Sequence, residues 1–288
     1  MQAHLVIQRR MNPKLVLNTF ATLIILFFVF ILSSPSILQE QVFGSNTNNA
    51  SNSNDIPWQL IDFNPSLYSS ENKLSRIGTI TDGVSKLQLL IDYNETARLT
   101  IKGNEDLRYG TINANQSQLV GESNNESSLL ISPSATRDGF LINVEYTPPQ
   151  SYPVMNDDRN NSYRTVGIEV RDNYTVVSNI PIRLYRVPVV LVHGVWTDSD
   201  KSWKETNFDT ILINKGFSPS FADYRNYNAE TFDPYANITI GNQGIDSLRK
   251  TIKHVLNDYR EHKFIAASQV DVIAHSMCGN ILETYEKL

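Results

Sequence analysis

The sequence contains a single cysteine, Cys278, among its 288 residues. An intrachain disulfide therefore cannot form, which excludes a disulfide-stapled fold but is compatible with export. Clusters of basic residues are missing beyond the N-terminus, and the formal net charge is -5. Nucleic-acid binding is excluded on that ground, because it requires a basic patch that neutralises phosphates. Metal-ligand spacings and glycine-rich phosphate loops are also missing, so we expect neither a metal nor a cofactor.

One stretch of the chain lacks charge altogether. Residues 15–32 read LVLNTFATLIILFFVFIL, and roughly 18 residues is close to the minimum that spans a bilayer. Arg9, Arg10 and Lys14 precede this stretch, which predicts a cytoplasmic N-terminus with the rest of the chain outside. Residues 33–36 (SSPS) fit a signal-peptide cleavage region. We therefore interpret residues 1–36 as either a cleaved signal peptide or an uncleaved transmembrane anchor.

The location that follows is extracellular or cell-surface, with the protein either secreted or anchored in the membrane. N-x-S/T sequons, the acceptors of N-glycosylation, occur at Asn49, Asn94, Asn115, Asn125, Asn160, Asn173 and Asn237. Glycosylation at these sites requires an exported chain. Chance occurrence in an Asn- and Ser-rich sequence is the alternative, and the sequence leaves both open.

A polar, low-complexity stretch separates the N-terminal segment from the first folded unit. Residues 44–55 read GSNTNNASNSND, and we interpret residues 37–56 as a flexible linker. From residue 57 to residue 186, short apolar runs alternate with Asn, Gly, Ser and Pro clusters, without a long helical period. This rhythm predicts an antiparallel, immunoglobulin-like β-sandwich, with strands over residues 87–93, 97–101, 139–146, 165–170 and 182–185.

From residue 187 to residue 288, strands and helices are predicted to alternate, which indicates a second domain. Residues 187–192 (VPVVLV) are typical of a strand buried on both faces. A helix over residues 202–215 is predicted to point Trp203, Phe208, Ile211 and Leu212 inward and to end at Gly216. After it, a strand is predicted over residues 217–224 and a loop over residues 225–243. Apolar periodicity predicts a second helix over residues 245–262, and a strand over residues 270–273 follows.

The last strand runs into a turn that carries a serine. Residues 274–279 read AHSMCG, the apolar run before them ends at Ala274, and a helical pattern starts at Asn280. Ser276 is thus placed between a strand and a helix. This is the arrangement of the nucleophile elbow of α/β-hydrolases, whose usual pattern is G-x-S-x-G.

A second motif, His193-Gly194-Val195-Trp196, directly follows the strand 187–192. With the elbow, it resembles the α/β-hydrolase family, specifically its lipase and esterase branch, over residues 187–288. The resemblance implies the first half of a mostly parallel sheet with flanking helices. It also implies an oxyanion hole made by the backbone N–H groups of Val195 and Met277, with support from His193, Gly194, Ala274, His275, Cys278 and Gly279.

The base and the acid of a catalytic triad are missing from the sequence after Ser276. The hydroxyl of a serine is inert unless a base removes its proton, and in this family the order is Ser, then Asp or Glu, then His. No His follows Ser276, and the acids that follow are Glu283 and Glu286. We interpret Asp223 and Asp271 as structural residues at strand ends.

The five histidines of the chain are not expected to act as the base. His193 belongs to the oxyanion turn, and His275 points away from its neighbour at the elbow. His254 and His262 are predicted on the solvated side of a helix, and His4 lies in the N-terminal segment. The sequence therefore resembles the N-terminal part of a hydrolase from a truncated, frameshifted or split gene.

Two features bear on that interpretation. The strand 270–273 is predicted to lack a neighbour on its far edge, and an unpaired apolar edge promotes aggregation. Cys278 replaces the second glycine of the elbow, where its Cβ and sulfur are expected to crowd the helix at a cost of about 1–3 kcal/mol. A tolerated small residue, sequence decay and a functional thiol are the alternatives for Cys278.

The function predicted from the sequence is that of an exported serine hydrolase of the lipase or esterase type, acting on a small-molecule or lipid acyl ester through Ser276. The triad Asp and His are expected from sequence outside this chain, for example from a second polypeptide. The alternative is a catalytically inactive, glycosylated cell-surface or adhesion module. The N-terminal helix is the predicted membrane contact in both cases.

Overall fold

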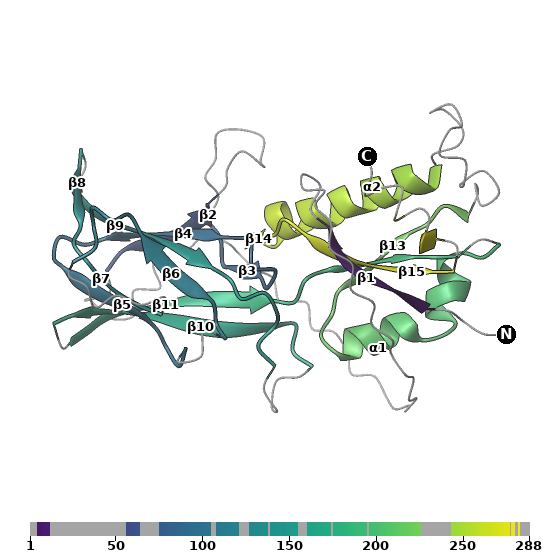
Figure 1. The fold of residues 1–288 in the computed structure, drawn as a ribbon, viewed down its shortest axis with the longest axis horizontal. Coiled ribbons are helices and arrows are strands. Elements are labelled where there is room, and N and C mark those ends of the chain that lie inside the picture. The colour runs from purple at the N-terminus through teal and green to yellow at the C-terminus, as the bar shows by residue number, and fades with distance from the viewer. Residues whose placement is uncertain are drawn as a thin grey trace.

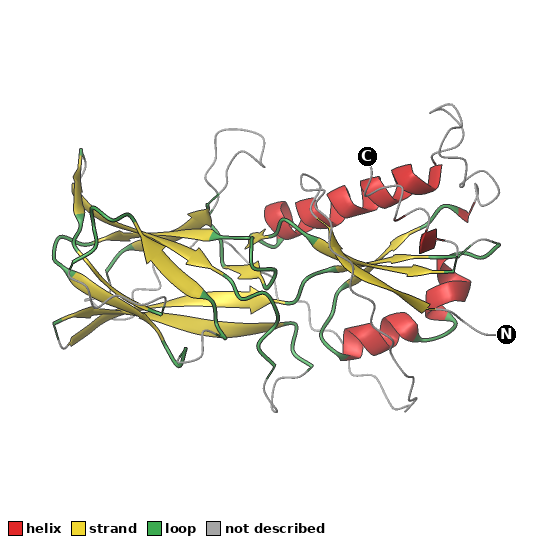
Figure 2. Cartoon of the chain, viewed as in Figure 1, coloured by secondary structure: helices red, strands yellow, loops and turns green. Residues whose placement is uncertain are grey.

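The computed structural model describes residues 5–11, 56–63, 75–104, 108–120, 127–137, 139–154, 160–173, 175–194, 196–225, 243–276, 278–279 and 282. Within these ranges the chain forms two packed units (Figure 1). One is built from two layers of β-sheet. The other is a smaller sheet with helices on its two faces (Figure 2).

The β unit contains two sheets. The larger one contains, in spatial order, β14 (Ile265–Ala266), β3 (Gly78–Ile80), β11 (Thr175–Tyr185), β10 (Tyr163–Asp172), β5 (Ala97–Ile101) and β7 (Ser128–Ile131). The smaller one contains β2 (Trp58–Asp62), β4 (Leu87–Asp92), β9 (Gly139–Thr147) and β6 (Thr111–Ala114), with β8 (Ser134–Thr136) paired to β9.

Alternation of buried and more exposed residues explains these strands. Successive side chains of a strand point to opposite faces, so a strand between core and solvent buries every second residue. Leu89 and Ile142 of the smaller sheet and Leu99, Ile168 and Ile182 of the larger sheet are all fully buried in one core. The five strands predicted from the sequence in this region are confirmed.

The second unit is built on a four-stranded sheet of order β1 (Leu5–Met11), β15 (Val270–His275), β12 (Val189–Val192) and β13 (Pro219–Ala222). β12 is parallel to β13 and β15, whereas β1 is antiparallel to β15. Val190 and Val192 pack in the core shared with α2 (Gln243–Asn257) and its π-helical extension η4 (Asp258–His262). Val189 and Leu191 pack on the opposite face, with Trp203 of the π-helical turn η2 (Asp200–Lys204) and with α1 (Phe208–Asn214).

The fold class predicted from the sequence is wrong: it was an α/β fold, with a mostly parallel hydrolase sheet preceded by an all-β sandwich-like domain and an N-terminal membrane or signal helix. Of the described residues, 44% are strand and 19% are helix. Most strands belong to the β unit, where antiparallel pairs dominate, and the four-stranded sheet of the second unit is mixed. The α/β class was taken from the hydrolase-like motifs of residues 187–288, whereas most strands lie in the preceding region, for which the sequence already predicted a β-sandwich.

The predicted transmembrane helix is also corrected. Among the helices of the described ranges, none is long and apolar enough to cross a membrane, and residues 15–32 lie outside the described residues. Residues 5–11, expected on the cytoplasmic side, instead form β1 and pair with β15 from Leu5↔His275 to Met11↔Val270. The far edge of β15, expected to be unpaired, is therefore covered by β1.

The helix predicted over residues 202–215 is interrupted. Asn207 has a φ of 57°, a left-handed conformation that separates η2 from α1. Trp203 is buried, and Phe208 and Leu212 pack against it, but Ile211 is 40% exposed and does not point inward. Gly216 ends α1 at a φ of 79°, as predicted, and a Cβ there would lie 2.4 Å from the carbonyl oxygen of Asn161.

The two units share a seam of buried polar contacts. β14 comes from the C-terminal part of the chain, yet it pairs with β3 and forms the edge of the larger β-unit sheet. Next to it, Asp82 Oδ2 accepts hydrogen bonds from Ser85 Oγ (2.6 Å) and Ser268 Oγ (3.2 Å). Asp82 Oδ1 accepts from the backbone N–H groups of Val84 (2.9 Å) and Ser85 (2.8 Å).

We expect Asp82→Ala to lower the free energy of unfolding by about 2–4 kcal/mol, because it leaves several buried donors without an acceptor. Urea unfolding of the full chain measures this change. The matched control is Asp92→Ala at an exposed position of β4, which should change stability by less than about 0.5 kcal/mol. Equal effects of the two substitutions would contradict the assigned role of Asp82.

Candidate functional site

Ser276 lies on a tight turn between β15 and a helical segment, as the sequence predicts. Its φ is 61°, and its carbonyl accepts a hydrogen bond from the N–H of Gly279 at 3.3 Å. A left-handed conformation is unfavourable for a residue with a Cβ, and such strain is found where function requires it. The Ser276 side chain is exposed, whereas Ala274 and Cys278 on either side of it are buried.

The HG motif lies directly against this turn. β12 and β15 are parallel with Val192 opposite Ala274, so the residues after each strand emerge at the same edge of the sheet. A Cβ added to Gly194 would lie 3.2 Å from Ser276 Cβ and 3.0 Å from His275 Nδ1. Glycine at position 194 therefore permits the close approach of the two motifs, which are separated by about 80 residues of sequence.

His193 holds the turn from inside the protein. Its ring is fully buried and stacks on Tyr224, with the ring centroids 4.0 Å apart. Nε2 accepts the backbone N–H of Tyr224 at 3.1 Å, so the proton resides on Nδ1, which donates to the Gly194 carbonyl at 2.9 Å. Both ring nitrogens are occupied, which supports the predicted structural role of His193 and leaves neither nitrogen free to act as a base.

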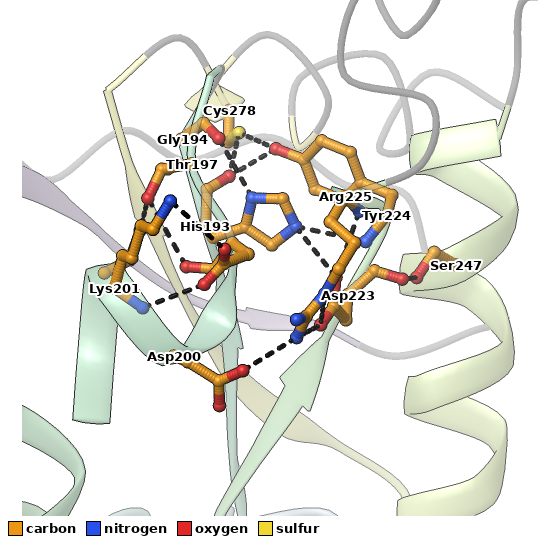
Figure 3. A network of polar contacts seen from close by, with 12 residues as sticks. His193, Gly194, Thr197, Asp200, Lys201, Asp223, Tyr224, Arg225, Ser247 and Cys278 are labelled. Atoms are coloured by element: carbon orange, nitrogen blue, oxygen red, sulfur yellow. Dashed lines mark hydrogen bonds and ion pairs between the residues drawn. The ribbon is translucent and has the colours of Figure 1, made fainter. Parts of the chain in front are cut away.

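An ion-pair cluster lies beside the His193 ring, whose Nε2 is 3.4 Å from Asp223 Oδ1 (Figure 3). Arg225 binds Asp223 Oδ2 through Nε at 2.8 Å and Asp200 Oδ2 through Nη2 at 3.1 Å. Burial alone would raise the pKa of Asp223, but the hydrogen bonds and charge of Arg225 outweigh it and lower that pKa. The cluster joins the end of β13 to η2, and it agrees with the structural role predicted for Asp223.

Cys278 is fully buried beneath the turn. Its Sγ contacts the His193 carbonyl oxygen and the Tyr224 hydroxyl. Burial raises the pKa of the thiol from 9.0 to about 11, so the thiol stays protonated at neutral pH. Because a reactive cysteine needs an accessible thiolate, Cys278 is a structural residue.

The structure places no described histidine as a base for Ser276. His254 is exposed on α2, and His262 is exposed and lies 3.6 Å from Asp258. His275 Nδ1 is buried without a hydrogen-bond partner among the described residues, and its ring packs edge-on against Trp203. His4, Glu283 and Glu286 lie outside the described residues, as do Val195 and Met277, the predicted oxyanion donors.

Two residues of the site were missed in the sequence. Tyr224 lies at the end of a predicted strand, and nothing in its local pattern indicates contact with two motifs far away in sequence. Trp196 has a φ of 62° and is 81% exposed, two residues after Gly194. The sequence analysis named Trp196 within the motif 193–196, but the sequence alone does not show that its side chain is exposed. Within the described ranges, His, Cys, Asp and Glu form no group of three that would hold a metal ion.

Comparison with known families and with curated proteins found no match for this chain. The resemblance to α/β-hydrolases therefore rests on residues 193–196 and 274–279 alone. The expectation that the chain is classed as a hydrolase or lipase receives no support from these comparisons. A function for this chain must therefore be argued from the geometry of the site.

Because Ser276 has a positive φ, we expect glycine at this position to give a more stable protein than alanine, which is the opposite of the usual order. A Cβ at positive φ costs about 1–2 kcal/mol, whereas glycine elsewhere in a strand or helix is destabilising by about 0.5–1 kcal/mol relative to alanine. We expect Ser276→Gly to be more stable than Ser276→Ala by about 1 kcal/mol in urea unfolding. The control pair at exposed Ser134 of β8 should show the opposite order. If the alanine variant were more stable than the glycine variant at both positions, the inferred backbone strain at Ser276 would be contradicted.

Because the pKa of the Cys278 thiol is raised in the folded protein, we expect the protein to lose stability at alkaline pH. Below pH 9 the thiol is protonated in both the folded and the unfolded chain, so its full contribution to the free energy of unfolding is present. As the pH rises from 9.0 towards about 11, the unfolded chain releases the proton first. The free energy of unfolding then falls by up to about 3 kcal/mol, at 1.36 kcal/mol per pH unit.

Urea unfolding from pH 8 to pH 11 checks this expectation by comparing the wild type with Cys278→Ala. Other groups titrate in both proteins, so the difference between the two curves isolates the thiol. The stability difference should shrink or reverse as the pH rises. Parallel curves would show that the thiol titrates equally in the folded and unfolded states.

Proposed function

We propose that Ser276 is the nucleophile in the cleavage of a small-molecule acyl ester. The observation that carries this proposal is the exposed serine in a left-handed conformation on a strand-to-helix turn, pressed against Gly194. Strain at an exposed nucleophilic side chain has a stability cost, and a purely structural turn would be served better by glycine. The buried side chains of His193, Tyr224 and Cys278 pack beneath the turn and contact one another.

The reaction has two steps. The Ser276 hydroxyl loses its proton to a base and its oxygen attacks the ester carbonyl, and the alcohol leaves with a proton as the acyl-serine forms. Water then attacks the acyl-serine, which releases the carboxylic acid and restores the hydroxyl. In the proposal, backbone N–H groups of Val195 and Met277 bind the oxyanion, and the base comes from outside the described residues or from a second polypeptide.

The exposed aromatic ring of Trp196 supports an ester with an apolar part. It lies two residues beyond Gly194, whose Cα faces the Ser276 side chain. Removing an aromatic ring from water by contact with an alkyl or aryl group is favourable. We therefore include an apolar acyl or alcohol group near Trp196 in the proposed substrate class.

Chemical rescue tests the nucleophile whichever group serves as its base. The full chain is treated with a fluorophosphonate probe, with and without imidazole as an external base. We expect covalent labelling at Ser276 that imidazole accelerates at least about tenfold, because a general base contributes about 10²–10⁴-fold to such steps. Ser276 is exposed, so imidazole can reach it.

Two variants make the result specific. Ser276→Ala should abolish labelling, and Ser134→Ala, an exposed serine on β8, should leave it unchanged. Labelling without imidazole would mean that the chain supplies its own base, and rescue by imidazole alone would mean that the base comes from elsewhere. Absence of Ser276-dependent labelling of the folded protein under both conditions would refute the proposal.

A glycosylated, catalytically inactive surface module is the second candidate. One observation favours it: the described sequon residues Asn94, Asn115, Asn160 and Asn173 are all exposed. These sites also support export as part of the first proposal. The two candidates differ in the labelling experiment, because an inactive module shows no reaction at Ser276 with any added base.

A further inference from the structure

Three segments meet in a buried contact beneath Ser276. His193 follows β12, Tyr224 follows β13, and Cys278 follows the elbow. The Tyr224 hydroxyl and the Cys278 sulfur both contact the His193 carbonyl oxygen and also contact each other. Figure 3 shows the three groups converging on one point. All three residues are at most 2% exposed, so water does not compete for these contacts.

The hydrogen-bonding capacity of these groups fits the arrangement. A carbonyl oxygen has two lone pairs, and the hydroxyl and the thiol have one proton each. Burial raises the pKa of Tyr224, as it does for Cys278, so both groups keep their protons. The His193 carbonyl can therefore accept both donors, one from β13 and one from the elbow.

This contact fixes the first carbonyl of the HG turn. The His193 carbonyl is held by Tyr224 and Cys278, and the next carbonyl, that of Gly194, is held by the His193 ring at 2.9 Å. Two successive peptide carbonyls are thus fixed.

We propose that Cys278 is a positioning residue, which together with Tyr224 sets the separation between the Ser276 elbow and the HG turn. This inference rests on the proposed function, since it assigns a role in the reaction of Ser276. Cys278 does not touch the substrate in this proposal. It acts through the His193 carbonyl, whose position determines where the turn lies relative to the nucleophile.

The structure shows buried contacts of the Cys278 sulfur that the sequence did not predict. Crowding by Cys278 would make Cys278→Gly, which restores the usual G-x-S-x-G pattern, neutral or beneficial. In the structure the sulfur fills the space between the His193 carbonyl and the Tyr224 hydroxyl, and glycine would leave that space empty. We therefore expect Cys278→Gly to slow the reaction of Ser276 rather than to accelerate it.

The test measures fluorophosphonate labelling of Ser276 in imidazole and separates the maximal labelling rate from the probe affinity. Cys278→Gly should lower the maximal rate on the order of tenfold, less than the roughly 10²-fold that a 1 Å misplacement can cost. Probe affinity should stay unchanged. Cys278→Ser, which keeps a donor at this position, should retain most of the wild-type rate.

Two further variants separate positioning from general destabilisation. Leu89→Ala opens a cavity in the core between the two sheets of the β unit and should leave the labelling rate unchanged at temperatures where the protein is folded. Tyr224→Phe should slow labelling, and its effect should not multiply with that of Cys278→Gly, because both act on one carbonyl. A Cys278→Gly protein that labels as fast as the wild type would overturn the inference.

Hydrogen exchange distinguishes this failure from failure of the proposed function. If the wild type shows no Ser276-dependent labelling, the proposed reaction fails and the role of Cys278 in it fails too. Exchange of peptides that contain Gly194 then shows whether the coupling itself exists. Faster exchange in Cys278→Gly, with β10 peptides unchanged, supports the coupling, and equal exchange overturns it independently of activity.

Discussion

The parallel pairing of β12 with β15 is the constraint on which the candidate site depends. Its register runs from Val189↔Asp271 to Val192↔Ala274, and the N–H of Asp271 donates to the Pro188 carbonyl at 2.9 Å. Because parallel strands end at the same edge, the HG turn and the serine turn emerge together. A shift of one residue would exchange the two faces of β15 and separate Gly194 from Ser276.

The sequence allowed this part of the structure to be predicted because the residue types meet local requirements. Gly194 is needed where two backbones approach closely, and Ser276 interrupts an apolar run at the point where a strand ends. The alternating strands of residues 87–185 were predictable for a similar reason, since burial on one face of a sheet imposes a period of two on the sequence. In each case the signal lies within a few neighbouring residues.

Other features depend on contacts that no local pattern encodes. β14 is two residues long, and β1 was interpreted as part of a membrane-directed N-terminus, so neither was predicted. The left-handed Asn207 interrupts a segment whose apolar spacing suggested one helix. Tyr224 was assigned to a strand, but its role arises from the meeting of three chain segments. The crowding expected at Cys278 was inferred from the motif alone, and the contact of its sulfur with Tyr224, which follows β13, was not predicted.

The seam connects the β unit to the nucleophile through β15. Residues 265–268 are fixed in the β unit by the pairing of β14 with β3 and by the contacts of Ser268 with Asp82 and Ser85. β15 begins two residues later and is bonded to β12 and β1 on its two sides. β15 is therefore preceded by a segment that is fixed in the β unit, and it is paired along both of its edges. The pattern of the sequence changes at residue 187, but β14 pairs with β3 in the larger sheet of the β unit, so the segment that leads into β15 belongs to both units.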